Sequence, residues 1–146
     1  MTTTPLQRTL TYRLHLLHKL SDVESHRAYL AAATMSMSAG RCLAAVGSFA
    51  PLSVNDLAAT ANLTKSQASR AAQSLVEQKL VAKAGSLTDG RGVVLSLTAA
   101  GSVRWRQVMA LIDRRNHEIF GDLSDAERQQ LSDIFDRLLV HAAARG

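Results

Sequence analysis

Two helix-start signals stand close together in the middle of this 146-residue chain. Ser53 is followed three residues later by the acidic Asp56, and Thr64 is followed at the same spacing by Gln67. Each pair has the form of a capping box, in which side-chain oxygens accept hydrogen bonds from amide groups at the first turn of a helix. The pattern predicts two short helices joined by a tight turn at residues 62–63.

The second of these helices is expected to run from Thr64 to about Gln78, with two contrasting faces. Small and apolar residues recur on one face, which predicts close packing on a neighbouring helix: Ala68, Ala71 or Ala72, Leu75 and Val76. The opposite face carries short polar and basic side chains: Lys65, Ser66, Gln67, Ser69, Arg70, Gln73 and Ser74.

After Leu80 the residue pattern changes from helical to strand-like. Residues 81–83 are a short strand candidate, residues 85–92 read as a glycine-punctuated hairpin, and the branched residues of 93–97 predict the returning strand. Two short capped helices followed by a two-stranded ribbon are typical of a winged helix-turn-helix. A helix of this kind fits the major groove of DNA, where base edges display a readable pattern of donors and acceptors.

Long helices are expected on both sides of this segment. Leucines spaced three and four residues apart mark one face of a helix over 5–33: Leu6, Leu10, Leu14, Leu17 and Leu20. A second helix is expected near 35–47. A long helix is expected over 99–120, and Gly121 is expected to end it. A last helix is expected to begin at a third capping box, formed by Ser124 and Glu127. We therefore expect a mainly α fold, residues 1–146 forming one domain, with a winged-helix lobe at about 36–98 and dimerisation helices at about 5–33 and 99–142.

Charge and cysteine content narrow the function further. The net charge is +5, and the basic excess lies outside residues 121–146, which carry five acidic and three basic groups. This balance is compatible with binding to nucleic acid. A single cysteine, Cys42, excludes an intrachain disulfide and fits a cytoplasmic protein. We find no signal peptide, no membrane-spanning stretch, no metal or cofactor motif and no catalytic motif, so an enzyme is not expected.

Five stretches together resemble the MarR family of transcriptional regulators. They are 52–58 (LSVNDLA), 63–70 (LTKSQASR), 75–77 (LVE), 89–91 (DGR) and 97–101 (LTAAG). The Asp-x-Arg hairpin tip followed by Leu-Thr-x-x-Gly is the most specific part of the likeness. The order of the flanking helices also fits that family.

The resemblance implies a homodimer that binds a pseudo-palindromic operator in double-stranded DNA. It implies that the second capped helix enters the major groove, that Arg91 at the hairpin tip enters the minor groove, and that Asp89 holds the tip. The candidate DNA contacts are Thr64, Lys65, Ser66, Gln67, Ser69, Arg70, Gln73, Ser74, Lys83 and Arg91. The apolar stripe of the last helix, which includes Leu131 and Phe135, is expected to lie in the dimer interface.

The resemblance also implies a repressor that a small effector releases, with an aromatic acid as the candidate. The family's pocket lies between its first, second and fifth helices, and the candidate ligand residues here are His18, Ser25, Arg41 and Trp105. The chain departs from the family pattern at two positions. Lys79 replaces a glycine after the recognition helix, and Gly40 replaces an aromatic residue, which is expected to enlarge the pocket.

Two other interpretations remain open at this point. The winged helix could serve as a protein-interaction module, as some winged helices do. Alternatively, Cys42 could make the protein a redox-responsive regulator, which requires an accessible thiol with a lowered pKa. Trp105, the one tryptophan, could line the pocket or pack in the core.

Overall fold

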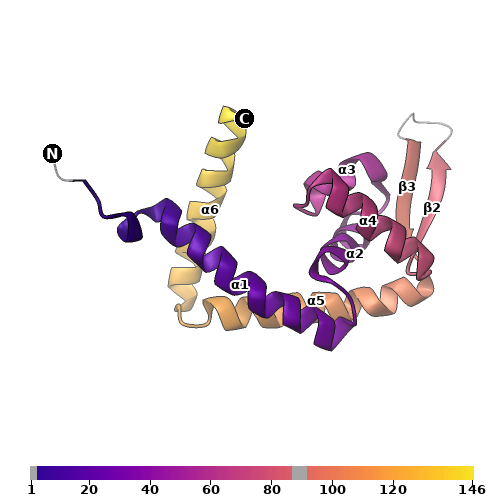
Figure 1. Ribbon diagram of the computed structural model, residues 1–146, viewed down its shortest axis with the longest axis horizontal. Helices are drawn as coiled ribbons and strands as arrows, with labels where there is room; N and C mark the ends of the chain where they lie inside the picture. The colour runs from indigo at the N-terminus through magenta and orange to yellow at the C-terminus, as the bar shows by residue number, and fades with distance from the viewer. Residues whose placement is uncertain (1–2, 87–91) are drawn as a thin grey trace. The chain divides into compact units, whose positions relative to one another are not determined.

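The structure is a computed structural model that describes residues 3–86 and 92–146. The chain divides into two compact units, Met1–Ile112 and Asp113–Gly146, and helix α5 runs from the first into the second. Figure 1 shows the elements in chain order. They are η1 (Leu6–Arg8), α1 (Leu10–Ala33), α2 (Met37–Phe49), β1 (Leu52–Ser53), α3 (Val54–Thr60), α4 (Lys65–Glu77), β2 (Val81–Ser86), β3 (Gly92–Leu97), α5 (Ala99–Phe120) and α6 (Asp125–Arg145).

The predicted fold class, mainly α with a winged helix-turn-helix, is confirmed. Thr64 and Gln67 form a complete capping box at the start of α4, and Ser124 and Glu127 form another at α6. The Ser53 hydroxyl accepts from the Asp56 amide at 3.1 Å, which starts α3. In the ranges that the structure covers, no helix combines the length and apolar character that crossing a bilayer requires.

The wing belongs to a three-stranded antiparallel sheet with the order β1-β3-β2. Strand β2 pairs with β3 from Val81 opposite Leu97 to Ser86 opposite Gly92. Strand β1 adds Leu52 opposite Leu95 on the other side of β3. The sequence predicted the pair β2 and β3 but not β1, because a strand of two residues shows no alternation.

Helix α4 packs closely on α2 because its inward face is made of small side chains. Ala68, Ala71, Ala72 and Leu75 are all buried, as the sequence predicted, and Val76 is half-buried. Alanines let two helix backbones approach closely, so α4 lies flat on its support with its polar face outward. The largest fully buried side chains among the described residues come from several elements: Cys42, Leu43, Val46, Leu57, Leu75, Leu95, Val108 and Leu111.

The end of α4 is fastened to the start of α5 by a set of residues that we call the Thr98 joint: Lys79, Leu80, Thr98 and Gly101. The Thr98 amide donates to the Leu80 carbonyl at 3.1 Å, and the Thr98 hydroxyl donates to the Lys79 carbonyl at 2.7 Å. The same hydroxyl accepts from the Gly101 amide at 2.9 Å and so caps α5. These bonds explain why threonine and glycine stand three residues apart in the Leu-Thr-x-x-Gly motif.

Gly101 is required in this joint by space, not by backbone conformation. A Cβ atom placed on it would lie 1.8 Å from the Leu80 carbonyl oxygen. Lys79, by contrast, adopts a left-handed backbone with φ of 60°. Glycine adopts a left-handed backbone at a free-energy cost about 1 kcal/mol lower than lysine does.

Cys42 lies in the core of the first unit and is fully buried. Burial raises the pKa of its thiol from an ordinary value of 9.0 to about 11. A thiol that stays protonated at neutral pH and cannot be reached by solvent lacks both requirements for oxidation. The redox-responsive interpretation therefore has no support here, and Cys42 acts as a core residue.

We predict that Gly101→Ala destabilises the protein by about 1–3 kcal/mol, because the new methyl group would overlap the Leu80 carbonyl. Urea unfolding followed by circular dichroism, at one fixed protein concentration, would measure the change. Gly85→Ala is the matched control, since nothing lies within 4 Å of a Cβ at Gly85. Equal stability of the two variants would contradict the close approach at the joint.

We also predict that Cys42 contributes a pH-dependent part of the stability at alkaline pH. Since the unfolded chain ionises its thiol near pH 9 and the folded protein near pH 11, the contribution is complete below pH 9 and is lost as the pH rises to 11. The loss should be roughly 2–3 kcal/mol. The measurement is the free energy of unfolding of the wild type minus that of Cys42→Ala, from pH 7 to 11. A difference that does not change with pH would show that the thiol ionises normally.

Candidate functional site

One face of α4, the helix labelled in Figure 1, carries exposed polar side chains. The predicted contact residues on it are exposed with one exception: Thr64, Lys65, Ser66, Gln67, Ser69, Arg70 and Gln73. Ser74, the exception, is half-buried, and its hydroxyl accepts from the Gln78 side chain at 2.9 Å. Ser74 is therefore the weakest candidate of the set.

Some of these side chains already hold hydrogen bonds within the helix. The Gln67 side-chain oxygen accepts from the Thr64 amide at 3.1 Å, and the Gln73 amide donates to Glu77 at 3.3 Å. The side chains of Ser69 and Arg70 form no such bond in the part of the chain that the structure describes. Ser69 and Arg70 can therefore reach a neighbouring molecule without breaking an internal contact.

The wing contributes Lys83, whose exposed side chain extends from β2. Asp89 and Arg91, the two predicted residues of the hairpin tip, lie outside the described residues. Their roles remain those that the family resemblance implies.

A cavity of about 420 Å³ lies within the first unit. Helices α1, α2 and α5 and the turn between α3 and α4 all contribute to it. Its lining residues are His18, Arg41, Ala44, Ala45, Ser48, Phe49, Thr60, Ala61, Asn62, Met109 and Ile112. We call this space the upper cavity. An apolar lining with a few polar side chains is the composition of a small-molecule site.

Two of the four predicted ligand residues line the upper cavity and two do not. His18 and Arg41 are lining residues. Ser25 is buried elsewhere on α1, and Trp105 packs against α2, with its indole N–H donating to the Ala44 carbonyl at 3.3 Å. Ser25 and Trp105 do not line this cavity, so their assignment to a ligand site stays a prediction, and the contact with Ala44 favours core packing for Trp105.

Two glycines of α2 explain how aromatic rings fit against that helix. A Cβ atom on Gly47 would lie 2.2 Å from the Trp105 ring, and one on Gly40 would lie 2.3 Å from the Tyr29 ring. The expectation that Gly40 leaves a larger pocket is therefore wrong, because Tyr29 fills the space from α1. Burial also raises the pKa of the Tyr29 hydroxyl, while the nearby Arg41 charge lowers it.

Asp22, which was not predicted as a site residue, links the two basic residues of the upper cavity. His18 Nε2 lies 3.1 Å from one carboxylate oxygen of Asp22, and Arg41 Nη2 lies 3.2 Å from the other. The spacing of His18 and Asp22, four residues apart on a helix, was a signal for the first contact. The contact with Arg41 joins α1 to α2 and left no signal in the sequence.

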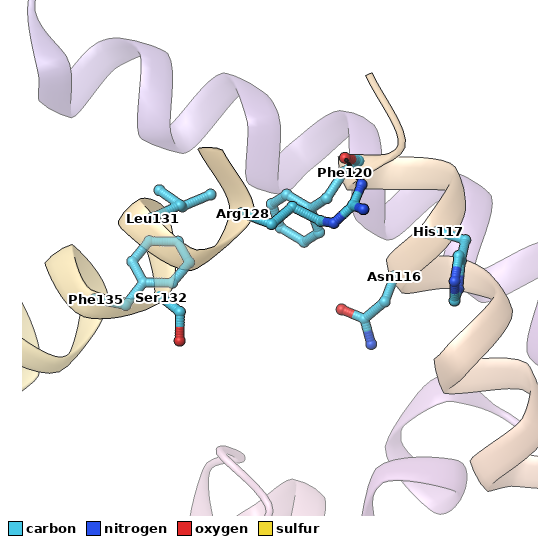
Figure 2. Close-up of a pocket in the computed structure, with 7 residues that line it drawn as sticks. All are labelled: Asn116, His117, Phe120, Arg128, Leu131, Ser132 and Phe135. Atoms are coloured by element: carbon cyan, nitrogen blue, oxygen red, sulfur yellow. Dashed lines mark hydrogen bonds between the residues drawn. The ribbon is translucent and has the colours of Figure 1, made fainter. Parts of the chain in front are cut away.

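A second cavity, of about 280 Å³, lies within the second unit (Figure 2). Its walls come from the end of α5 and the first half of α6: Asn116, His117, Phe120, Arg128, Leu131, Ser132 and Phe135. Arg128 closes the turn between these helices by donating to the Leu123 carbonyl at 2.7 Å and by pairing with Asp125. The apolar lining continues the exposed stripe of α6, so this hollow belongs to an uncovered helix face.

Comparison with known proteins places the fold. A sequence model of the MarR family matches residues 33–92. No match is found among curated proteins. A MarR family transcriptional regulator from Silicibacter pomeroyi has a similar structure with a TM-score of 0.82 and 23% identity, covering 96% of this chain and 94% of that one.

Two further solved structures share the fold at lower identity. The PcaV transcriptional regulator from Streptomyces coelicolor, in complex with its natural ligand, has a TM-score of 0.76 and 19% identity, covering 97% of this chain and 99% of that one. BpsR from Bordetella bronchiseptica, whose DNA binding is described as regulated by 6-hydroxynicotinic acid, has a TM-score of 0.81 and 15% identity over 94% and 97% of the two chains. The chain is therefore similar to the MarR family over residues 33–92, which include its helix-turn-helix, and it shares the winged-helix fold of these solved structures over nearly its whole length.

Proposed function

We propose that the protein is a sequence-specific transcriptional repressor that binds double-stranded DNA through α4. The observation that carries this proposal is the division of α4 into a buried alanine face and an exposed polar face. A helix that packs on α2 through its alanine face leaves its polar face free to enter the major groove, which is about 12 Å wide. A protein that binds chromosomal DNA in this way would be located in the cytoplasm.

The proposed contacts divide into base-reading and phosphate-binding groups. Arg70, Ser69 and Ser66 project from the exposed face and can bond to base edges, as arginine does with guanine. Lys65, at the first turn, and Lys83, on the wing, are suited to phosphates. Arg91 is proposed to enter the minor groove with Asp89 holding the hairpin tip, on the strength of the resemblance.

We propose further that the active form is a homodimer. Large apolar side chains are exposed along α1, with Leu10 at 79% and Leu17 at 66%, and along α6, with Leu139 at 69%. A row of this kind is unfavourable in water and is stabilised when a second copy covers it. A two-fold dimer would present two α4 helices about 34 Å apart, which matches one turn of DNA and a pseudo-palindromic operator.

The upper cavity is the proposed effector site. It lies against the turn that leads into α4 and against α5, on which the end of α4 is fastened. An effector that fits the cavity better in the unbound protein than in the DNA complex lowers the affinity for DNA by linkage. Arg41 and His18 favour an aromatic acid, and BpsR, which has the same fold, is regulated by one.

We predict that Arg70→Ala weakens binding to a duplex enriched by the wild type from a random-sequence pool. The loss should be about 1–3 kcal/mol, because a base contact is removed. Fluorescence anisotropy with the labelled duplex measures it. Arg145→Ala, which removes the same charge from the acidic C-terminal segment, is the matched control and should change the affinity little.

Two results would contradict the proposal. One is equal affinity of the Arg70 and Arg145 variants for the selected duplex. The other is the absence of any enriched duplex, which would favour a protein-interaction module. Binding should also weaken steeply as salt rises, since contacts with phosphates release counterions.

A further inference from the structure

The upper cavity contains an internal counter-ion for the groups that would bind an acid. Asp22 contacts both basic residues of the lining, at 3.1 Å for His18 and 3.2 Å for Arg41. Asp22 itself does not belong to the lining. Its carboxylate and the Arg41 guanidinium are about one-third exposed, so water screens their interaction only partly.

This arrangement has a direct consequence for an anionic ligand. A carboxylate that binds Arg41 in the cavity must approach a guanidinium whose Nη2 already donates to Asp22 at 3.2 Å. The ligand must therefore either displace Asp22 or accept a like charge nearby, and both lower its affinity. A neutral ligand of the same shape is not repelled by Asp22 and does not compete with it for Arg41.

We propose that Asp22 sets the charge selectivity of the effector site by competing with the ligand for Arg41. This inference rests on the proposed effector role of the upper cavity. Asp22 acts as a positioning residue, because it works through Arg41 and does not itself touch the ligand. Neutralising it should make the cavity more favourable to aromatic acids specifically.

The test is isothermal titration calorimetry on the full chain with two probes of nearly equal shape, salicylate and its neutral amide, salicylamide. Asp22→Asn should bind salicylate about tenfold more tightly than the wild type. The same variant should bind salicylamide with less than about a twofold change. Asp122→Asn, which removes the same charge from the turn before α6, is the matched control and should leave both affinities unchanged.

Two further variants keep the test decisive. Asp22→Ser is a second neutral variant. It replaces Asp22→Asn in the test if thermal denaturation shows that Asp22→Asn is unfolded. Adding Arg41→Gln to Asp22→Asn should abolish the gain for salicylate, because the gain depends on the guanidinium. A gain that persists without Arg41 would overturn the proposed competition.

The remaining outcomes separate this inference from the effector proposal. If the wild type binds salicylate and neither Asp22 variant binds it more tightly, the inference about Asp22 is wrong while the effector site stands. If salicylate binds only when Asp22 is neutral, the inference is supported. If no variant binds either probe at millimolar concentration, the effector proposal fails and the inference fails with it.

Discussion

The Leu80 carbonyl is the point on which the functional half of this molecule depends. It accepts the Thr98 amide, and it lies where only a glycine at position 101 leaves room for α5. Because Leu80 follows α4 and precedes β2, while Thr98 follows β3, this one contact fastens α4 and both wing strands to the same helix end. The polar face of α4 and the wing are thus held by one rigid support, which the proposed binding to a DNA duplex would require.

The upper cavity lies against the same helix α5 that supports α4 and the wing. Its lining includes Met109 and Ile112 of α5, and Asn62 of the turn into α4, which adopts a left-handed backbone. In the proposed mechanism, a ligand there touches both the support and the start of the helix that it supports. His18 and Arg41, the basic pair of the lining, already contact Asp22. Occupancy and charge selectivity would therefore be set by residues far from α4 in sequence that share a cavity with Asn62, in the turn before α4.

Sequence reasoning predicted the parts of this structure that short-range chemistry determines. The capping oxygens of Thr64 and Ser124, the alanine face of α4 and the pairing of β2 with β3 all follow from residues a few positions apart. Features that depend on distant residues were missed or misplaced. Tyr29 fills the space at Gly40, Trp105 covers Gly47, and Asp22 reaches Arg41, and no periodicity records which side chain meets which helix.

The central claim, that α4 enters the major groove, can be tested by attaching an iron chelate to a cysteine introduced at Ser69. Ser69 is exposed and Cys42 is buried, so the label should attach at the new site alone among the residues the structure describes. With a duplex selected by the protein, the account predicts DNA cleavage in two clusters about one helical turn apart, facing the major groove. Tight binding of that duplex with no localised cleavage would show that α4 lies away from the DNA and would contradict the account.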